Sequence, residues 1–444
     1  MSNLFRAVAA AGLAGLILAF AGCSDDNDDT PVGPPPIYTS IVITGPDSLL
    51  IGDTGTFAAT VIDTGGNPVA SPALEWTTSA SGVASVNGAG VATGVSEGEV
   101  LIRAQGGGVV SNAVPLSVLQ GLGWVDQSAA APVVQNLRGV WFVTNREGWI
   151  VGDLGTILHT LDAGKTWATQ ASNSTGYALN AVAFISPGTG VVVGSSGRIL
   201  RTTNGGATWA PVTADTDNLK ALNHVFFQDA TRGWITGNNG LILRSNNGGA
   251  SWTRVLPVPT TANLQRIAFP RNHTGSNPPT DPYGWGWAVG DGGAILGSRD
   301  FGQTWRLQVP FVTTDPLLGV ARRDITHAIA VGTNNATLNT FASADSADWQ
   351  LTPPTVPFAN FTAVAWSDSS ALPGSAWAVG KRPDSSLPVA MYSDDGGNSW
   401  TDQFLPGTAP LSGNSLEDVF FLDDLHGWAV GTQGLILHTA TGGR

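Results

Sequence analysis

An eight-residue box recurs through the C-terminal three quarters of the chain and constrains its fold more than any other feature. The box reads Ser/Thr-x-Asp/Asn-x-Gly-x-Ser/Thr-Trp. Five copies match it: TLDAGKTW, TTNGGATW, SNNGGASW, SRDFGQTW and SDDGGNSW, which end at Trp167, Trp209, Trp252, Trp305 and Trp400, respectively. A sixth, degenerate copy, SADSADW, ends at Trp349. A repeat of this kind sets the architecture, because each unit buries its apolar face only against its neighbours.

The last copy is incomplete, since the sequence ends in TATGGR at residues 439–444, where a Ser/Thr-Trp pair is due. A segment that can supply the missing tryptophan lies far upstream. The segment LGWVDQ around Trp124 resembles the segments that follow other boxes, such as KTWATQ and NSWTDQ. This arrangement predicts a closed ring in which the first strand completes the last unit.

Three further landmarks precede each box: Leu-x-x-Val-x-Phe, Gly-Trp-x-x-Gly and Gly-x-Ile-Leu-x-Ser/Thr. They predict three short strands per unit, with a fourth that begins at the box tryptophan. Units start near residues 137, 179, 222, 264, 317, 361 and 416. Where nothing is inserted the spacing is about 42 residues, the length of one four-stranded propeller blade. No stretch shows sustained helical periodicity, so we expect an all-β protein with seven blades. In the fifth unit Arg322 replaces the expected aromatic residue.

The repeated box residues have a structural interpretation. Asp or Asn in such a turn accepts hydrogen bonds from nearby backbone N–H groups, and Gly adopts positive φ. The predicted turn residues are Asp162, Asn204, Asn247, Asp300 and Asp395. We expect the box tryptophans to pack between neighbouring sheets. They are Trp124, Trp167, Trp209, Trp252, Trp305, Trp349 and Trp400.

The boxes resemble the Asp-box (BNR) repeats of sialidases, xyloglucanases and related propellers. The whole unit is most similar to the photosystem II assembly/stability factor family of seven-bladed propellers, over about residues 121–444. The resemblance implies a propeller over residues 120–444 and an assembly or scaffolding role through protein binding. One fold hosts many roles, so the resemblance indicates function less specifically than fold.

The N-terminus resembles a bacterial lipoprotein signal. Arg6 precedes an apolar run over residues 7–22, which suits a signal-peptide core and is short for a membrane-spanning helix. Cys23, the only cysteine, follows at once and precedes SDDNDDT. We expect a signal peptide at 1–22, lipidation of Cys23 and a disordered tether over 23–36, with anchoring at the outer membrane or cell surface rather than the inner membrane. An ordinary secretory signal is the alternative.

Residues 37–119 resemble a bacterial Ig-like group 2 domain through LEWTTS at 74–79, VASVNGAGVATGV at 83–95 and GEVLIRA at 98–104. The resemblance implies a β-sandwich with Trp76 at the centre of its core. Such a module acts as a spacer or an adhesive unit.

Charge argues against a nucleic-acid partner. The net charge is −13, whereas phosphate binding requires a surplus of Lys and Arg. Residues 121–444 hold 23 acids and 18 bases, so the repeat region is nearly balanced and the acidity lies nearer the N-terminus.

Catalytic signals are weak. A xyloglucanase-like mechanism needs two carboxylates flanking a cleft, for which Asp153 and Asp291 are candidates; the alternative is that each is a solvated turn residue. Sialidase chemistry needs an arginine cluster, but Arg138 and Arg266 fall on first strands, and Arg201 and Arg244 on third strands. His224, His327 and His426 show no metal-ligand spacing. We therefore expect no enzyme, metal or cofactor.

Binding on one propeller face is the favoured function. The turns between second and third strands share a face, and their polar residues could hold a peptide or glycan, or could serve solubility alone. The candidate rim comprises Asp153, Asn238, Asn239, Asp291, Asn334, Lys381, Arg382 and Gln433. The opposite face carries a long insertion at 270–283. We expect a monomeric envelope protein that binds a protein or glycan partner; a glycan hydrolase and a surface adhesin remain alternatives.

Overall fold

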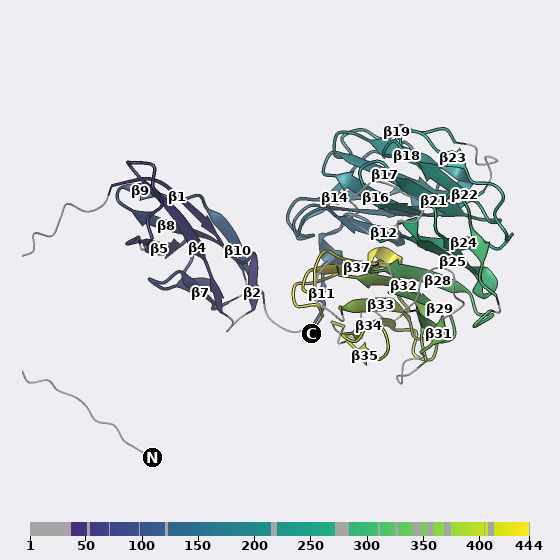
Figure 1. Cartoon of the computed structure of the whole chain (residues 1–444). Coiled ribbons are helices and arrows are strands. Elements are labelled where there is room, and N and C mark those ends of the chain that lie inside the picture. The colour runs from purple at the N-terminus through teal and green to yellow at the C-terminus, as the bar shows by residue number, and fades with distance from the viewer. Residues whose placement is uncertain are drawn as a thin grey trace, which may run out of the picture. The chain divides into compact units, whose positions relative to one another are not determined.

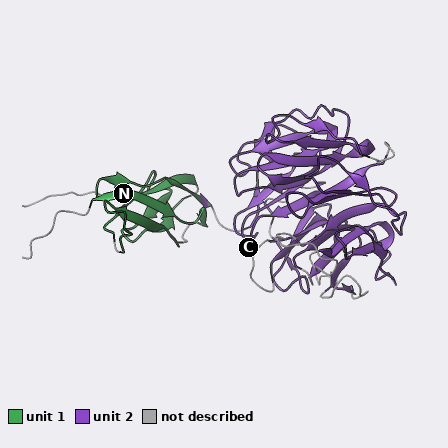
Figure 2. Ribbon diagram, turned by 45° about the horizontal axis from the view of Figure 1, so that its top comes forward, with its two compact units in different colours: residues 1–117 green, residues 118–444 purple. Residues whose placement is uncertain are grey.

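The computed structural model divides the chain into two compact units, residues 1–117 and residues 118–444 (Figure 2). It describes residues 37–50, 54–70, 72–96, 98–119, 123–214, 220–270, 284–309, 311–324, 327–340, 349–352, 358–367, 374–403, 405–406 and 413–443. The predicted signal, tether, lipidated Cys23 and the insertion over 271–283 lie outside these residues. Within the described part, no helix is long and apolar enough to span a membrane.

The described residues of the first unit form three small sheets. In one, β1 (Tyr38–Thr44) pairs with β4 (Ala58–Asp63). The second follows the order β2 (Ser48–Leu50), β10 (Val114–Leu119), β8 (Gly98–Gly106) and β5 (Glu75–Thr78), with β9 (Val109–Val110) beside β8. The third follows the order β3 (Thr54–Thr56), β7 (Val91–Gly94) and β6 (Ala84–Val86).

The core of this unit differs from the prediction at Trp76. The alternation along β8 buries Val100, Ile102 and Ala104, and Phe57 is the largest fully buried side chain among the described residues of this unit. Trp76 is only half-buried, with its ring 6.4 Å from that of Phe57. The physical reason is that β5, which contains Trp76, is the edge strand of its sheet.

The second unit contains seven four-stranded sheets, which confirms the all-β, seven-bladed prediction (Figure 1). Blades are numbered here in the order of their first strands. Blade 1 has β12 (Leu137–Phe142), β13 (Gly148–Gly152), β14 (Ile157–Thr160) and β15 (Ala168–Thr169). Blade 2 has β16 (Leu179–Ser186), β17 (Thr189–Gly194), β18 (Ile199–Thr202) and β19 (Ala210–Pro211). Blade 3 has β20 (Leu222–Phe227), β21 (Gly233–Gly237), β22 (Ile242–Ser245) and β23 (Thr253–Arg254). Blade 4 has β24 (Leu264–Ala268), β25 (Gly286–Gly290), β26 (Ile295–Ser298) and β27 (Arg306–Leu307).

The remaining blades follow the same order. Blade 5 has β28 (Leu317–Arg322), β29 (Ala328–Gly332), β30 (Thr337–Thr340) and β31 (Gln350–Leu351). Blade 6 has β32 (Asn360–Trp366), β33 (Ala376–Lys381), β34 (Pro388–Ser393) and β35 (Thr401–Asp402). Blade 7 has β36 (Leu416–Phe421), β37 (Gly427–Gly431) and β38 (Ile436–Thr439), and its fourth strand is β11 (Val125–Asp126).

The ring closes through the strand that follows Trp124. Val125 pairs with His438 and Asp126 with Leu437, so an N-terminal strand completes the C-terminal blade. The first strand of every blade contacts the first strands of both neighbours, and β12 contacts β36. These pairings confirm the predicted closure. The predicted start of each fourth strand was one residue early, because pairing begins after the box tryptophan.

The apolar core lies between blades. Seven clusters each join side chains of two neighbouring blades. Second strands such as β13 are buried on both faces, so their sequences are continuous apolar runs. The ring of Trp149 in blade 1 stacks 3.6 Å from that of Phe184 in blade 2, and Trp428 of blade 7 stacks 3.5 Å from Phe142 of blade 1.

Candidate functional site

The polar atoms of the box are engaged within the turn itself. In blade 1, Asp162 Oδ1 accepts hydrogen bonds from Thr166 N (2.9 Å) and Thr160 Oγ1 (2.8 Å), and Oδ2 accepts one from Thr166 Oγ1 (2.6 Å). Partial burial raises the pKa of Asp162, but these bonds and nearby Lys165 outweigh it and hold the pKa below its usual value. The carboxylate therefore fixes the turn.

Two boxes use Asn in place of Asp, with one hydrogen bond reversed. Thr208 N donates to Asn204 Oδ1 (2.9 Å), as in the Asp form, but Asn204 Nδ2 donates to Thr208 Oγ1 (3.0 Å). Asn247 and Ser251 repeat this geometry in blade 3. Both residue types stabilise the same turn, so a carboxylate is not required there.

The fourth residue of the box joins neighbouring blades through its carbonyl oxygen. Trp428 Nε1 donates to the carbonyl of Ala163 (3.1 Å), which links blade 7 to blade 1. Trp234 Nε1 donates to Phe301 O (3.1 Å), and Trp377 Nε1 donates to Gly442 O (2.9 Å). The box is thus a clamp between blades.

The two candidate catalytic carboxylates are held within their own blades. Asp153 accepts hydrogen bonds from Arg138 Nε (2.5 Å) and Asn136 Nδ2 (3.0 Å). Asp291 accepts them from Asn263 Nδ2 (2.9 Å) and Gln265 Nε2 (2.8 Å). Both side chains lock the turn after the second strand to the segment that enters the blade.

The other candidate rim residues lie in or beside the corresponding turns of their blades and are likewise engaged. Asn239 N donates to Asn263 Oδ1, Asn334 N to Asn360 Oδ1 and Gln433 N to Asn136 Oδ1. Asn238 Oδ1 accepts from Asn223, Lys381 Nζ donates to Gly413 O, and Arg382 pairs with Asp402. Four of these six contacts tie a turn to the next blade, whereas those of Asn238 and Arg382 stay within their own blades.

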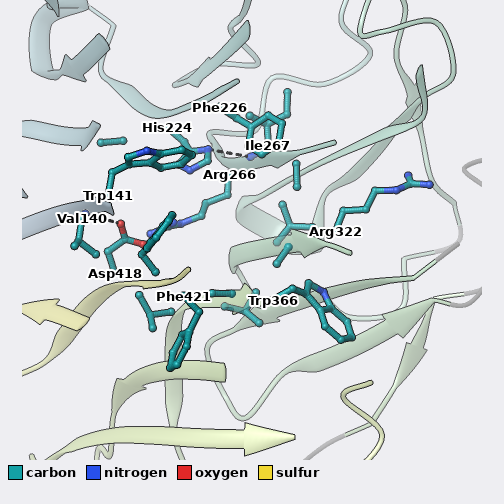
Figure 3. Close-up of a pocket in the computed structure, with 18 of the residues that line it drawn as sticks. Val140, Trp141, His224, Phe226, Arg266, Ile267, Arg322, Trp366, Asp418 and Phe421 are labelled. Atoms are coloured by element: carbon teal, nitrogen blue, oxygen red, sulfur yellow. Dashed lines mark hydrogen bonds and ion pairs between the residues drawn. The ribbon is translucent and has the colours of Figure 1, made fainter. Parts of the chain in front are cut away.

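The cavity on the propeller axis, called here the axial cavity, is lined by first strands of all seven blades (Figure 3). Its volume is about 90 Å³. The side chains that give it chemical character are Trp141, His224, Phe226, Arg266, Arg322, Arg323, Trp366, Asp418 and Phe420. The lining residues begin at the third residue of the first strands or later and extend one residue past the ends of β28 and β32, to Arg323 and Ser367. The cavity therefore fills the half of the channel beside the turns between first and second strands, away from the candidate rim.

An ion pair crosses this cavity. Arg266, on β24 of blade 4, places Nη1 2.7 Å from Asp418 Oδ1 on β36 of blade 7, and both side chains are largely buried. Asp418 Oδ2 also accepts a hydrogen bond from Val140 N of blade 1 (3.0 Å). Figure 3 shows the guanidinium of Arg266 directed toward Asp418. We call Arg266 and Asp418 the cross-channel pair.

The irregular residue of blade 5 contributes to the same cavity. Arg322, at the position of the repeated aromatic residue, is 7% exposed, and its Nε donates to Asp324 O (2.7 Å). Burial lowers the pKa of Arg322 to about 9, against the opposing charge of Asp324. The guanidinium is still cationic at neutral pH. Nearby, Arg323 lies over the Trp366 ring, 6.0 Å from its centroid.

Sequence reasoning did not group these residues. Arg266, His224 and Arg322 stood out singly, whereas Asp418, Arg323 and Trp366 went unremarked. A signal was present at the third position of the Leu-x-x-Val-x-Phe landmark, which is Gly139 in blade 1 and Ala363 in blade 6. Four blades have Gly or Ala there, and the other three have His224, Arg266 and Asp418. Variation at this one position of an otherwise regular repeat indicates side chains with a role other than packing.

Among described residues, no group of three His, Cys, Asp or Glu side chains could hold a metal ion.

Comparison with known proteins agrees with the repeat. Residues 169–259 match the family model of the photosynthesis system II assembly factor YCF48. Structures of YCF48 resemble the propeller: YCF48 bound to a D1 peptide is 20% identical, with a TM-score of 0.55, covering 73% of this chain and 98% of that chain. YCF48 from Cyanidioschyzon merolae is 19% identical, with a TM-score of 0.55, covering 71% and 98%.

The same fold occurs in unrelated functional classes. Virginiamycin B lyase from Staphylococcus aureus is 11% identical, with a TM-score of 0.56, covering 72% of this chain and 99% of that chain. No curated protein sequence matches the chain. The unit from residue 118 onward is therefore a YCF48-like BNR propeller in fold, and at these identities the structural likeness shows the fold alone.

Proposed function

We propose that this protein is a lipid-anchored envelope factor whose propeller binds an acidic segment of a partner protein at the axial cavity, in an assembly or scaffolding role. The observation that carries this proposal is the charge of the cavity lining. The lining contains the guanidinium groups of Arg266, Arg322 and Arg323 and the carboxylate of Asp418, so its formal charge is +2 when His224 is counted as neutral. Asp324, outside the lining, opposes Arg322. Charges in such a sheltered site act through a lower effective dielectric than in water.

The aromatic lining supports a polypeptide ligand. Trp141, Phe226 and Trp366 offer flat apolar surfaces beside the guanidinium groups. Aromatic residues and Arg are the side chains that most often dominate protein-binding sites. YCF48, the relative in fold, has been observed with a bound D1 peptide. We extend peptide binding, rather than the identity of the D1 partner, to this chain.

The N-terminal segments fit an anchoring role. The residues around Cys23 resemble a lipoprotein signal, and residues 37–119 resemble an Ig-like module that would act as a spacer between anchor and propeller. Lipidation predicts that the protein remains with outer-membrane or surface fractions and that Cys23→Ala releases it from membranes. Membrane fractionation together with mass spectrometry of the N-terminal peptide tests this: an unmodified Cys23 in the mature chain would contradict it.

The binding proposal is tested by crosslinking in cells followed by mass spectrometry. The full chain should yield crosslinks between a partner and residues near the axial cavity. The double variant Arg266→Gln/Arg323→Gln should lose that partner at least tenfold in recovery. Arg306→Gln, on the outermost strand of blade 4, is the matched control and should retain it. Equal recovery of the partner with the native protein, the double variant and the control would contradict the proposal.

A further inference from the structure

We propose that Asp418 is an internal competitor for the ligand: its carboxylate occupies Arg266 until an acidic group displaces it, and so sets how strongly the propeller binds acidic segments. The inference rests on the proposed function, because it concerns the same cavity. It assigns Asp418 a specificity-determining role that a simple basic cavity would not contain.

The position of the pair supports this role. Blades 4 and 7 are separated by two blades on one side of the ring and by three on the other, so Arg266 must reach across the axis to meet Asp418. The equivalent repeat positions of blades 1, 2, 5 and 6 are Gly139, Ala181, Gly319 and Ala363. A Cβ at Gly139 or Gly319 would come within about 3 Å of the neighbouring first strand, so small residues here let the first strands pack closely around the axis that Arg266 crosses.

Stability does not explain why an ion pair is placed there. Removing two charges from water is costly, and a buried pair is often replaceable by apolar groups without loss of stability. The interfaces between blades are already filled by seven apolar clusters. A cross-channel pair also differs from the rim pair of Arg138 and Asp153, which joins the first strand of blade 1 to the turn after its second strand.

The hydrogen bonds of Asp418 make displacement feasible. When Arg266 turns toward another anion, Asp418 Oδ2 keeps its hydrogen bond from Val140 N. The charges that face the pair from the other lining strands are His224, Arg322 and Arg323, and none of these is an acid. An incoming carboxylate therefore meets a surplus of cationic groups in the lining, where Asp418 is its rival for Arg266; the charge of Asp324, outside the lining, acts on Arg322 instead.

The test measures the affinity of the purified full chain for a short acidic peptide by fluorescence anisotropy. The probe is a labelled Gly-Glu-Asp-Glu-Ala peptide with a free carboxylate, compared with its neutral amide analogue Gly-Gln-Asn-Gln-Ala. Asp418→Asn keeps an oxygen for Val140 N but frees Arg266, so it should bind the acidic peptide about tenfold more tightly than the native protein. Neither protein should gain affinity for the neutral peptide.

Matched variants separate this effect from a general change in charge. Asp394→Asn alters the charge equally at an exposed position of the blade 6 box and should leave the affinity unchanged. Arg266→Gln should weaken binding below the native level, and it provides the test if Asp418→Asn unfolds. Equal affinities of the native protein and Asp418→Asn would overturn the competitor role while leaving the proposed function intact. Absence of acidic-peptide binding by both would overturn the competitor role, and the crosslinking experiment would then decide the proposed function separately.

Discussion

Trp124 Nε1 donates a hydrogen bond to Gln403 Oε1 across 2.8 Å, although the two residues are separated by 279 positions. The Trp124 indole is 2% exposed and meets the Phe421 ring edge-on, with centroids 5.6 Å apart. The same tryptophan therefore fills the vacant seventh box position and connects blades 6 and 7. The closure of the ring depends on this residue and on the two-residue strand that follows it.

Substitution of Trp124 should open this closure. Trp124→Ala removes a fully buried indole, a change that costs about 3–5 kcal/mol in protein cores. Gln403→Ala removes this acceptor together with the hydrogen bond that Gln403 Nε2 donates to Gly442 O (2.7 Å), and should cost about 1–2 kcal/mol. Urea unfolding followed by tryptophan fluorescence measures both. If Trp124→Ala destabilised the protein no more than Gln403→Ala, the closure would not depend on the indole.

The repeat made the blade count, the strand order and the ring closure predictable, because each depends on contacts that recur at a fixed spacing. The clamps between blades were less predictable. Trp428 donates its hydrogen bond to the backbone carbonyl of Ala163. Every residue has a backbone carbonyl, so the residue type at this position does not reveal the acceptor. The cross-channel pair was missed for a different reason: Arg266 and Asp418 belong to opposite blades, and their proximity follows only from the diameter of the ring. Trp76 shows the reverse error, because a motif placed it in the core and the edge position of β5 left it half-exposed.

The box of blade 1 should tolerate an Asn but show a changed response to acid. The pKa of Asp162 is lowered in the folded protein, so its stabilising contribution is present above the unfolded value of 3.8 and is lost as pH falls through the folded value. Asp162→Asn should fold, since Asn204 and Asn247 support the same turn, and should show a shallower loss of stability below pH 4. Urea midpoints measured from pH 6 to pH 2.5 provide the comparison. An unchanged acid profile would mean that Asp162 does not contribute to it.

Backbone strain in two boxes predicts opposite outcomes for the same substitution. Ala163 and Phe301 both adopt left-handed backbone conformations, with φ of 66° and 57°. Ala163→Gly relieves this strain at the loss of one methyl group and should stabilise the protein by about 0.5–1 kcal/mol. Phe301→Gly removes a ring that is 4% exposed and lies under the guanidinium of Arg232, so it should destabilise by several kcal/mol, about the cost of a large core truncation. Thermal unfolding of the two variants should give shifts of opposite sign, and a loss of stability in Ala163→Gly would show that the methyl contact outweighs the strain.

His438 should make the closing blade sensitive to mild acid. It is buried against the Trp428 ring, with centroids 5.0 Å apart, and is paired in register with Val125 of the closing strand. Burial, with smaller contributions from His426 and Lys165, lowers the pKa of His438 from 6.5 to about 3. The folded state thus holds the ring neutral while the unfolded chain protonates it below about pH 6.5. Stability is fully present above that pH and falls as pH drops from 6.5 toward 3, by up to about 1.4 kcal/mol per pH unit. His438→Leu, which fills similar space without titrating, should flatten the stability profile between pH 6.5 and pH 4. Equal slopes for the native protein and the variant, measured by urea unfolding at half-unit pH steps, would show that His438 is not the titrating group.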